Sequence, residues 1–291
     1  MTGILLEEFI YGLVVDEDLS EVFINSAGST FGLVKSTNKM IQCKSPFSNE
    51  LELIDALQVL AHSQAGRLDA RLPFAGGSLW NGRGRWHAVI PPASDVAIAA
   101  FRCLSHNPLK IDDICASSKI RQAVINALEG ERAILIFGDT GAGKTTVLAT
   151  LLRTRCSDER VCVVESYPEI PLSSERWFRL NACPPKLDGK GEVSLATCLE
   201  QALRLRPDRI VQGEIRGAEI KNFLKISTLG HRAPLATVHG QGLADFQVRL
   251  ALEMKAVPDI NLVGLYVDRK KHLVTRVSSC VSSRIAEIRA G

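Results

Sequence analysis

The chain has 291 residues and carries 35 basic against 32 acidic side chains, a net charge of +3. This length predicts about two domains, and so small a charge excludes any argument for nucleic-acid binding from charge alone. The eight cysteines include no C-x-x-C pair, which argues against a zinc ribbon or a thioredoxin-type site. The sequence has no signal-peptide pattern and no apolar run of the roughly 18 residues that a membrane helix needs. We therefore expect a cytoplasmic protein that serves any membrane machine from the surface.

Residues 1–104 predict an N-terminal α+β domain. Apolar residues at helical spacing predict one helix over residues 1–20, and a second helix that is capped by Asn49 and stopped by Gly66. Alternating apolar residues predict strands at 22–24, 31–34, 71–74 and 85–90, with a glycine-rich loop over 76–84. Residues 95–104 fit either a strand or a short helix.

Residues 105–110 are the predicted linker, because 105–108 read Ser-His-Asn-Pro, and residues 111–291 are the predicted second domain. Its apolar patterns predict helices at 111–128, 146–153, 195–205 and 218–229, and buried strands at 133–137, 161–164, 210–211, 235–238 and 262–267. Such alternation predicts a parallel sheet that is covered on both faces. The strands 262–267, 272–277 and 284–288 are predicted to form an antiparallel extension.

The segment 133–146, AILIFGDTGAGKTT, combines an apolar strand, a glycine-rich turn and the start of a helix. The turn reads G-x-x-x-x-G-K-T, the pattern of a P-loop, whose backbone N–H groups surround a phosphate. Lys144 can then reach the β- and γ-phosphates, and the Thr145 hydroxyl can hold Mg²⁺. We therefore predict that ATP with Mg²⁺ binds here. The predicted nucleotide-binding residues are Gly138, Asp139, Thr140, Gly141, Ala142, Gly143, Lys144, Thr145 and Thr146.

Three carboxylates and a histidine follow predicted strands, where the parallel sheet would bring them toward the nucleotide. Glu214 comes after the strand at 210–211 and is predicted to orient or activate the attacking water. Glu165 and Glu169 follow the strand at 161–164 and could contact Mg²⁺ or polarise the water, although a solvated strand end explains them as well. His239 ends the strand at 235–238 and could donate a hydrogen bond to the γ-phosphate, unless its role is structural.

Four segments occur in order: GDTGAGKTT, VVESYPEI, LRLRPDRIVQGEIR and a GH pair followed by ATVH. They resemble the Walker A, aspartate-box, Walker B and histidine-box motifs of the secretion, or traffic, ATPases of type II and type IV secretion, type IV pili and conjugation. The resemblance implies an α/β fold, with a RecA-like P-loop domain and a smaller PAS-like α+β domain. It also implies a homo-oligomer, a hexameric ring. This motor would act at the cytoplasmic face of the inner membrane on the inner-membrane and cytoplasmic components of such an apparatus.

The N-terminal half resembles the conjugation and type IV secretion branch at residues 71–73, RLP, and 84–92, GRWHAVIPP. In that branch, arginines of the corresponding strands contact the terminal phosphate, which implies this role for Arg85 and Arg102. One departure is Glu165-Ser166, where relatives usually have Glu-Asp. Either ATP turnover is slow, or the carboxylates of Glu165 and Glu169 suffice to hold Mg²⁺.

Three other functions are open to a chain with these motifs. A nucleotide-gated regulatory or scaffold subunit that scarcely hydrolyses ATP is supported by Ser166 alone. A small-molecule kinase would need an arginine-bearing lid, and no such stretch follows Glu214. A nucleic-acid motor is weakened by the absence of a basic groove with interleaved aromatic residues. The sequence identifies neither the machine and its cargo nor the residues that bind the base and ribose.

Overall fold

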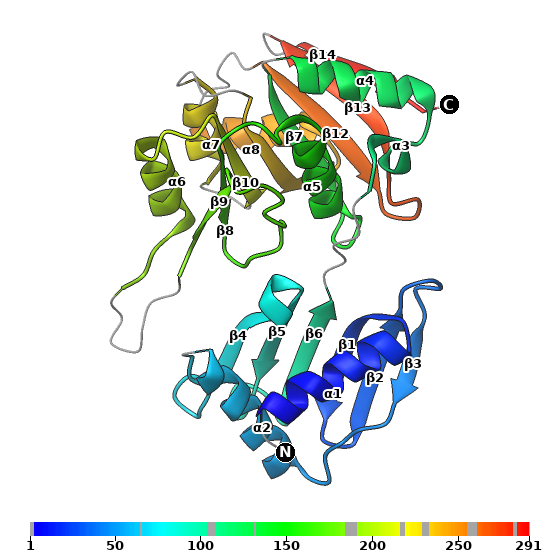
Figure 1. Ribbon diagram of the computed structural model, residues 1–291, viewed down its shortest axis with the longest axis vertical. Helices are drawn as coiled ribbons and strands as arrows, with labels where there is room; N and C mark the ends of the chain where they lie inside the picture. The colour runs from blue at the N-terminus through cyan, green and yellow to red at the C-terminus, as the bar shows by residue number, and fades with distance from the viewer. Residues whose placement is uncertain are drawn as a thin grey trace. The chain divides into compact units, whose positions relative to one another are not determined.

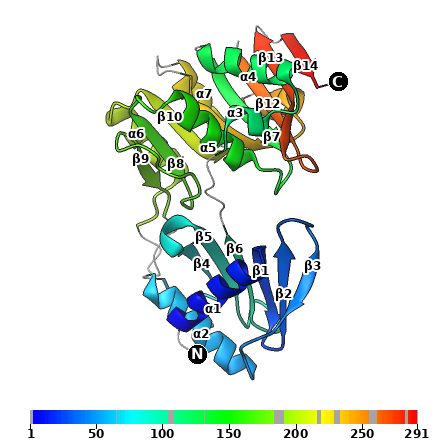
Figure 2. The same ribbon diagram turned by 45° about the vertical axis from the view of Figure 1, so that its right-hand side comes forward.

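The structure, a computed structural model, describes residues 3–64, 66–103, 109–130, 132–183, 191–215, 219–228, 233–254, 261–281 and 284–290. The chain divides into two compact units, Met1–His106 and Asn107–Gly291, each with its own sheet and its own hydrophobic core (Figures 1 and 2). The predicted linker stretch 105–108 lies outside the described residues.

The first unit is an antiparallel sheet in the order β3-β2-β1-β6-β5-β4, with two helices on one face (Figure 1). Apolar residues of α1 and α2 pack onto the buried face of the strands, as the helical spacing predicts. Asn49 caps α2, and its side chain accepts a hydrogen bond from the backbone N–H of Glu52. The elements are α1 (Gly3–Asp16), β1 (Leu19–Ser26), β2 (Ser29–Val34), β3 (Met40–Cys43), α2 (Glu50–Ser63), β4 (Phe74–Leu79), η1 (Trp80–Gly82), β5 (Gly84–Val89) and β6 (Ile98–Cys103).

The prediction of a loop over residues 76–84 is wrong, because residues 74–79 form β4 and residues 80–82 form a short 3-10 helix. Gly76 lies opposite His87 in the β4–β5 pair. A Cβ on Gly76 would lie 2.9 Å from His87 Nδ1 and 2.9 Å from the carbonyl oxygen of Trp86. Glycine therefore allows a close approach of two strands here and does not mark a turn. The ambiguous residues 95–104 contribute a strand, β6.

The second unit is a mixed sheet in the order β14-β13-β12-β7-β11-β10-β8-β9. The strands from β12 to β9 in this order run parallel, and β13 and β14 add antiparallel pairs at one edge. The predicted α/β fold is confirmed. The elements are α3 (Ile111–Ile114), α4 (Ser118–Glu129), β7 (Ala133–Gly138), α5 (Lys144–Arg155), β8 (Val161–Glu165), β9 (Phe178–Asn181), α6 (Leu195–Arg204), β10 (Arg209–Ile215), α7 (Glu219–Thr228), β11 (Leu235–His239), α8 (Leu243–Met254), β12 (Leu262–Asp268), β13 (Leu273–Val281) and β14 (Arg284–Arg289).

Helices cover both faces of the parallel strands. Residues of α3, α4 and α5 pack against one face, and residues of α6, α7 and α8 pack against the other. The central strand β7 contributes Ile134 and Ile136 to the first face and Leu135 and Phe137 to the second. All six residues of β7 are buried, which explains their unbroken apolar run. The P-loop thus begins at the carboxyl end of a fully buried strand.

Candidate nucleotide-binding site

The P-loop joins β7 to α5 by a turn that only glycine adopts easily at three positions. Gly138, Gly141 and Gly143 have φ values of 151°, 77° and 94°, in the region that L side chains rarely occupy. A Cβ on Gly138 would also lie 2.7 Å from the carbonyl oxygen of Val267. The turn contains Asp139 to Gly143, and the predicted residues Lys144, Thr145 and Thr146 form the first turn of α5. This strand–turn–helix geometry suits an anion at a helix N-terminus.

Three predicted catalytic side chains from three different elements meet beside this turn. Lys144 Nζ donates to the carbonyl oxygens of Gly138 and Asp139, each at 2.9 Å, and lies 3.4 Å from His239 Nδ1. His239 Nε2 lies 2.6 Å from Glu214 Oε1. His239 reaches this position because it pairs with Gly138 across β11 and β7. The structure therefore links the P-loop lysine to Glu214 through one imidazole ring.

In a neutral His239 ring, these contacts favour one position of the ring hydrogen. The ammonium group of Lys144 has donors only, so Nδ1 of a neutral imidazole acts as the acceptor. The other ring nitrogen, Nε2, then carries the hydrogen and donates it to Glu214. The ring is accordingly held in one tautomer by a cation on one side and a carboxylate on the other.

Glu165 lies at the end of β8 and is only 4% exposed. One carboxylate oxygen accepts the backbone N–H groups of Glu169 and Ile170, at 3.2 and 3.1 Å, and the other accepts Arg179 Nε at 2.9 Å. Burial raises the pKa of Glu165 to about 7, although the ion pair with Arg179 and the two N–H groups act to lower it. The Glu165 carboxylate therefore holds the backbone of the segment that follows β8 in place.

The predicted metal ligands do not form a preassembled metal site. Thr145 is half-buried on the first turn of α5, and Glu169 is half-buried just beyond β8. In the described part of the chain, no group of three or more His, Cys, Asp or Glu side chains could hold a metal ion. This arrangement fits Mg²⁺, which proteins commonly hold with one or two side chains together with the phosphates of the substrate.

Arg85 and Arg102 belong to the first unit, where they lie directly opposite each other in β5 and β6. Arg102 Nε lies 3.6 Å from Glu21 Oε1 on the neighbouring strand β1. Their contact with a terminal phosphate stays a prediction. The Gly230-His231 pair and Arg216 of the four-motif series lie outside the described residues.

A polar cluster beside the P-loop was not predicted from the sequence. Gln241 Nε2 lies 3.3 Å from Asp139 Oδ1, and Gln241 Oε1 accepts the hydroxyl of Tyr266 at 3.2 Å. Arg276 donates to the Gln241 carbonyl oxygen and stacks 4.5 Å above the Tyr266 ring. The only available signal was the position of Gln241 in a Gly-Gln-Gly turn just after His239. Beside this cluster is a hollow of about 500 Å³, lined by His239, Gly240, Asp245 and Val248.

A phosphate-binding turn after a buried parallel strand, with a carboxylate and a histidine at the same edge, defines a P-loop nucleoside triphosphatase. The family described as Type II/IV secretion system protein matches residues 10–285, and the chain belongs to this family. The predicted resemblance is therefore confirmed. The predicted enzyme class, an ATP hydrolase of the P-loop secretion type, is confirmed with it.

Several relatives resemble the chain over most or part of its length. "Putative conjugal transfer protein MT3759" of Mycobacterium tuberculosis is 32% identical over 248 residues, which are 82% of this chain and 70% of that protein. "Type IV secretion system protein VirB11" of Brucella suis is 31% identical over 128 residues, 43% of this chain and 36% of that protein. The solved ATPase DotB of Legionella pneumophila has a similar fold, with a TM-score of 0.62 at 19% identity, covering 99% of this chain and 80% of that one. Within the described residues, no helix is both long and apolar enough to cross a membrane.

Proposed function

We propose that this protein is a Mg²⁺-dependent ATPase that works as a hexameric ring. The ring powers a type IV secretion, conjugation or pilus assembly apparatus from the cytoplasmic face of the inner membrane. The observation that carries the proposal is the contact of Lys144 with His239 and of His239 with Glu214 beside the P-loop turn. Membership of the secretion family supports the kind of machine, as do the names of the relatives.

The chain's own residues have distinct tasks in this proposal. Lys144 exchanges its bonds to the Gly138 and Asp139 carbonyl oxygens for the β- and γ-phosphate oxygens of ATP. The Thr145 hydroxyl would hold Mg²⁺, which when bound would supply positive charge for the phosphates. Glu214 orients the attacking water, and His239, once Lys144 has moved away, keeps this carboxylate in position through Nε2.

The remaining predicted residues complete the site. Glu169 would help to hold Mg²⁺, and Glu165 fixes the backbone that carries Glu169. An N-terminal domain of residues 1–104 closes over the nucleotide held by residues 111–291, with the linker 105–110 between them. Arg85 and Arg102 then reach the terminal phosphate, where guanidinium groups stabilise developing negative charge.

The test measures ATP turnover with Mg²⁺ by the purified protein and by Lys144→Ala and Glu214→Gln, with the particle mass from light scattering. Matched controls are Lys119→Ala and Glu200→Gln, which change exposed residues on α4 and α6. We expect both site variants to lose at least about a hundredfold in turnover, the size typical of a lost general base or of a lost group that stabilises developing charge, and both controls to retain it. A nucleotide-bound particle near six subunits is the expected mass.

A nucleotide-gated scaffold is the alternative, and the same experiment separates the two. Tight ATP binding without turnover above the Glu214→Gln background would overturn the motor. In that case Ser166→Asp, which restores the carboxylate that relatives carry, is the first variant to measure.

A further inference from the structure

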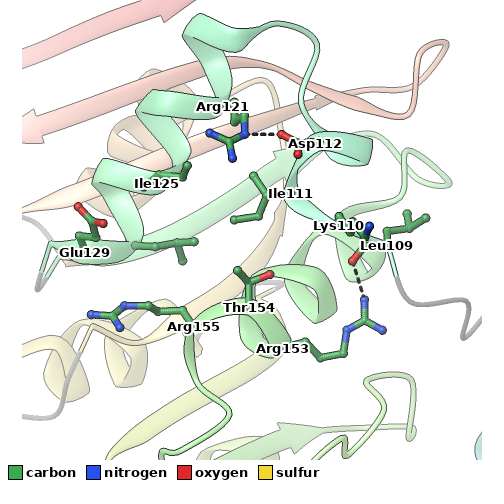
Figure 3. A pocket seen from close by; sticks show the side chains of 11 residues that line it. Leu109, Lys110, Ile111, Asp112, Arg121, Ile125, Glu129, Arg153, Thr154 and Arg155 are labelled. Atoms are coloured by element: carbon green, nitrogen blue, oxygen red, sulfur yellow. Dashed lines mark hydrogen bonds and ion pairs between the residues drawn. The ribbon is translucent and has the colours of Figure 1, made fainter.

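A second concave site lies on the second unit, away from the P-loop turn, between α4 and α5 (Figure 3). The cavity has a volume of about 550 Å³, and every residue that lines it belongs to this unit. Since one liquid water occupies roughly 30 Å³, a single ion would fill only a small part of this space. The volume falls in the range of about 300–1,000 Å³ that small-molecule sites occupy.

The floor of the cavity is apolar. Ile111 and Leu128 are buried, and Ile125 is half-buried on the same wall. Figure 3 places Ile111, Ile125 and Thr154 toward the middle, between the two helices. An apolar body that enters here covers the part of Ile125 that is still exposed and packs on the buried Ile111 and Leu128, which favours binding.

Two cations of the rim are fixed in place by neighbours. Arg121 forms an ion pair with Asp112, and Arg153 Nη2 donates to the carbonyl oxygen of Leu109 at 3.1 Å (Figure 3). The first contact joins α4 to α3, and the second joins α5 to the residue Leu109, which precedes α3. The walls of the cavity are therefore preformed, and little ordering would accompany binding.

Two further cations are available to a ligand. Within the described residues, neither the Arg155 guanidinium nor the Lys110 ammonium forms an ion pair, and both residues are exposed at the rim. Figure 3 shows Arg155 and Glu129 at one end of the cavity and Arg153 with Leu109 at the other. In total the lining has four cations and two carboxylates, so its field favours an anion.

We propose that this cavity binds a small amphipathic anion: an acidic group that pairs with Arg155, on an apolar body that packs on Ile111 and Ile125. The site is distinct from the nucleotide site, although one helix connects them. Lys144 is the first residue of α5 and Arg155 is the last, a separation of about 17 Å along a helix. A ligand that packs against the end of α5 is thereby in contact with the element that carries the P-loop lysine.

The test uses octanoate as the probe anion and 1-octanol as the neutral probe of matched length, both below the concentration at which octanoate forms micelles. The full chain is labelled with ¹³C at the isoleucine δ-methyl groups, and Ile111 and Ile125 are assigned from Ile111→Val and Ile125→Val. The measurement is the saturable chemical-shift change of these two methyls. It requires no ATP turnover, so its outcome is independent of the motor proposal.

We expect octanoate to shift both methyls saturably and 1-octanol to bind at least tenfold more weakly. Arg155→Glu should weaken octanoate about tenfold, equivalent to ~1.4 kcal/mol, whereas Lys119→Glu, a charge reversal on α4 outside the cavity, should leave it unchanged. The proposal is overturned if the two methyls do not respond, if octanol binds as well as octanoate, or if Arg155→Glu has no effect.

Discussion

Glu165 offers a test of the site that does not depend on catalysis. Its carboxylate is buried and bonded to Arg179 and to two backbone N–H groups. Burial nonetheless raises its pKa from 4.5 to about 7. Replacement by Gln keeps the size of the side chain and removes its titration, so a comparison with Glu165→Gln isolates the pH dependence that this one group contributes.

The sign of the effect follows from the raised pKa. Between pH 4.5 and 7 the folded state binds more protons at Glu165 than the unfolded state does, so stability falls as the pH rises. For a pKa of about 7 in the folded and 4.5 in the unfolded chain, the free energy of unfolding contributed by Glu165 falls by about 2.5 kcal/mol from pH 5 to pH 8. This contribution is fully present below pH 4.5 and is lost above pH 7.

The assay is urea unfolding at several values between pH 5 and pH 8, followed by the fluorescence of Trp177. This residue is buried in the second unit, whereas Trp80 and Trp86 belong to the first, so both are replaced by Phe in every sample. Subtracting the unfolding free energy of Glu165→Gln cancels other groups that titrate. A difference that is flat or that rises with pH would refute the argument, and would mean that the ion pair with Arg179 outweighs burial.

Two further substitutions test the packing of the same sheet by urea unfolding. Glu159→Ala leaves the buried Arg209 guanidinium, which the carboxylate contacts at 2.7 and 3.1 Å, without its charge partner, and should cost about 3–5 kcal/mol; a loss under about 1 kcal/mol would contradict the buried pair. Gly213→Ala places a Cβ 2.9 Å from Glu165 Cγ and should cost about 1–3 kcal/mol. Gly130→Ala, in the same unit, meets nothing closer than 3.4 Å; it is the control and should stay within about 0.5 kcal/mol. Equal costs at the two glycines would contradict the close approach.

The spacing of apolar residues predicted the helices and strands that bury a broad apolar face. It did not predict the short elements that bury little apolar surface. The all-buried strand β7 and the one-sided helix α2 carry patterns that a single sequence displays clearly. The four-residue strands β3 and β9 alternate or stay half-buried, so little apolar signal marks them. The helix predicted over 111–128 is two helices, because Ser117 caps α4 through the backbone N–H of Ile120.

Strand order could not be predicted, since it depends on contacts between distant segments. The P-loop strand β7 lies between β11 and β12, which follow it by about a hundred residues or more. Sequence alone places both strands somewhere in the same sheet. It does not place His239 opposite Gly138, and it is this register that brings the imidazole to the lysine of the P-loop.

The position of Glu214 depends on an irregularity that motif spacing does not encode. Gln212 pairs with Ala236 and Ile215 with Val238, so β10 has one residue more than β11 over this interval. Such a bulge re-aims side chains and leaves backbone groups without strand partners. Two buried polar side chains compensate: Thr237 Oγ1 donates to the Gly213 carbonyl oxygen at 2.5 Å, and Gln212 Nε2 donates to that of Glu214 at 3.1 Å.

Gln212 and Thr237 were the sequence signal for this bulge. Gln212 and Thr237 are only 1% and 2% exposed, and each follows apolar residues of its strand, β10 or β11. Buried polar groups persist where they satisfy a partner, and here the partners are the carbonyl groups of the bulge residues Gly213 and Glu214. Gln212 and Thr237 thus hold the backbone in the shape that presents the Glu214 carboxylate to His239, and they belong to the site although neither contacts the P-loop lysine.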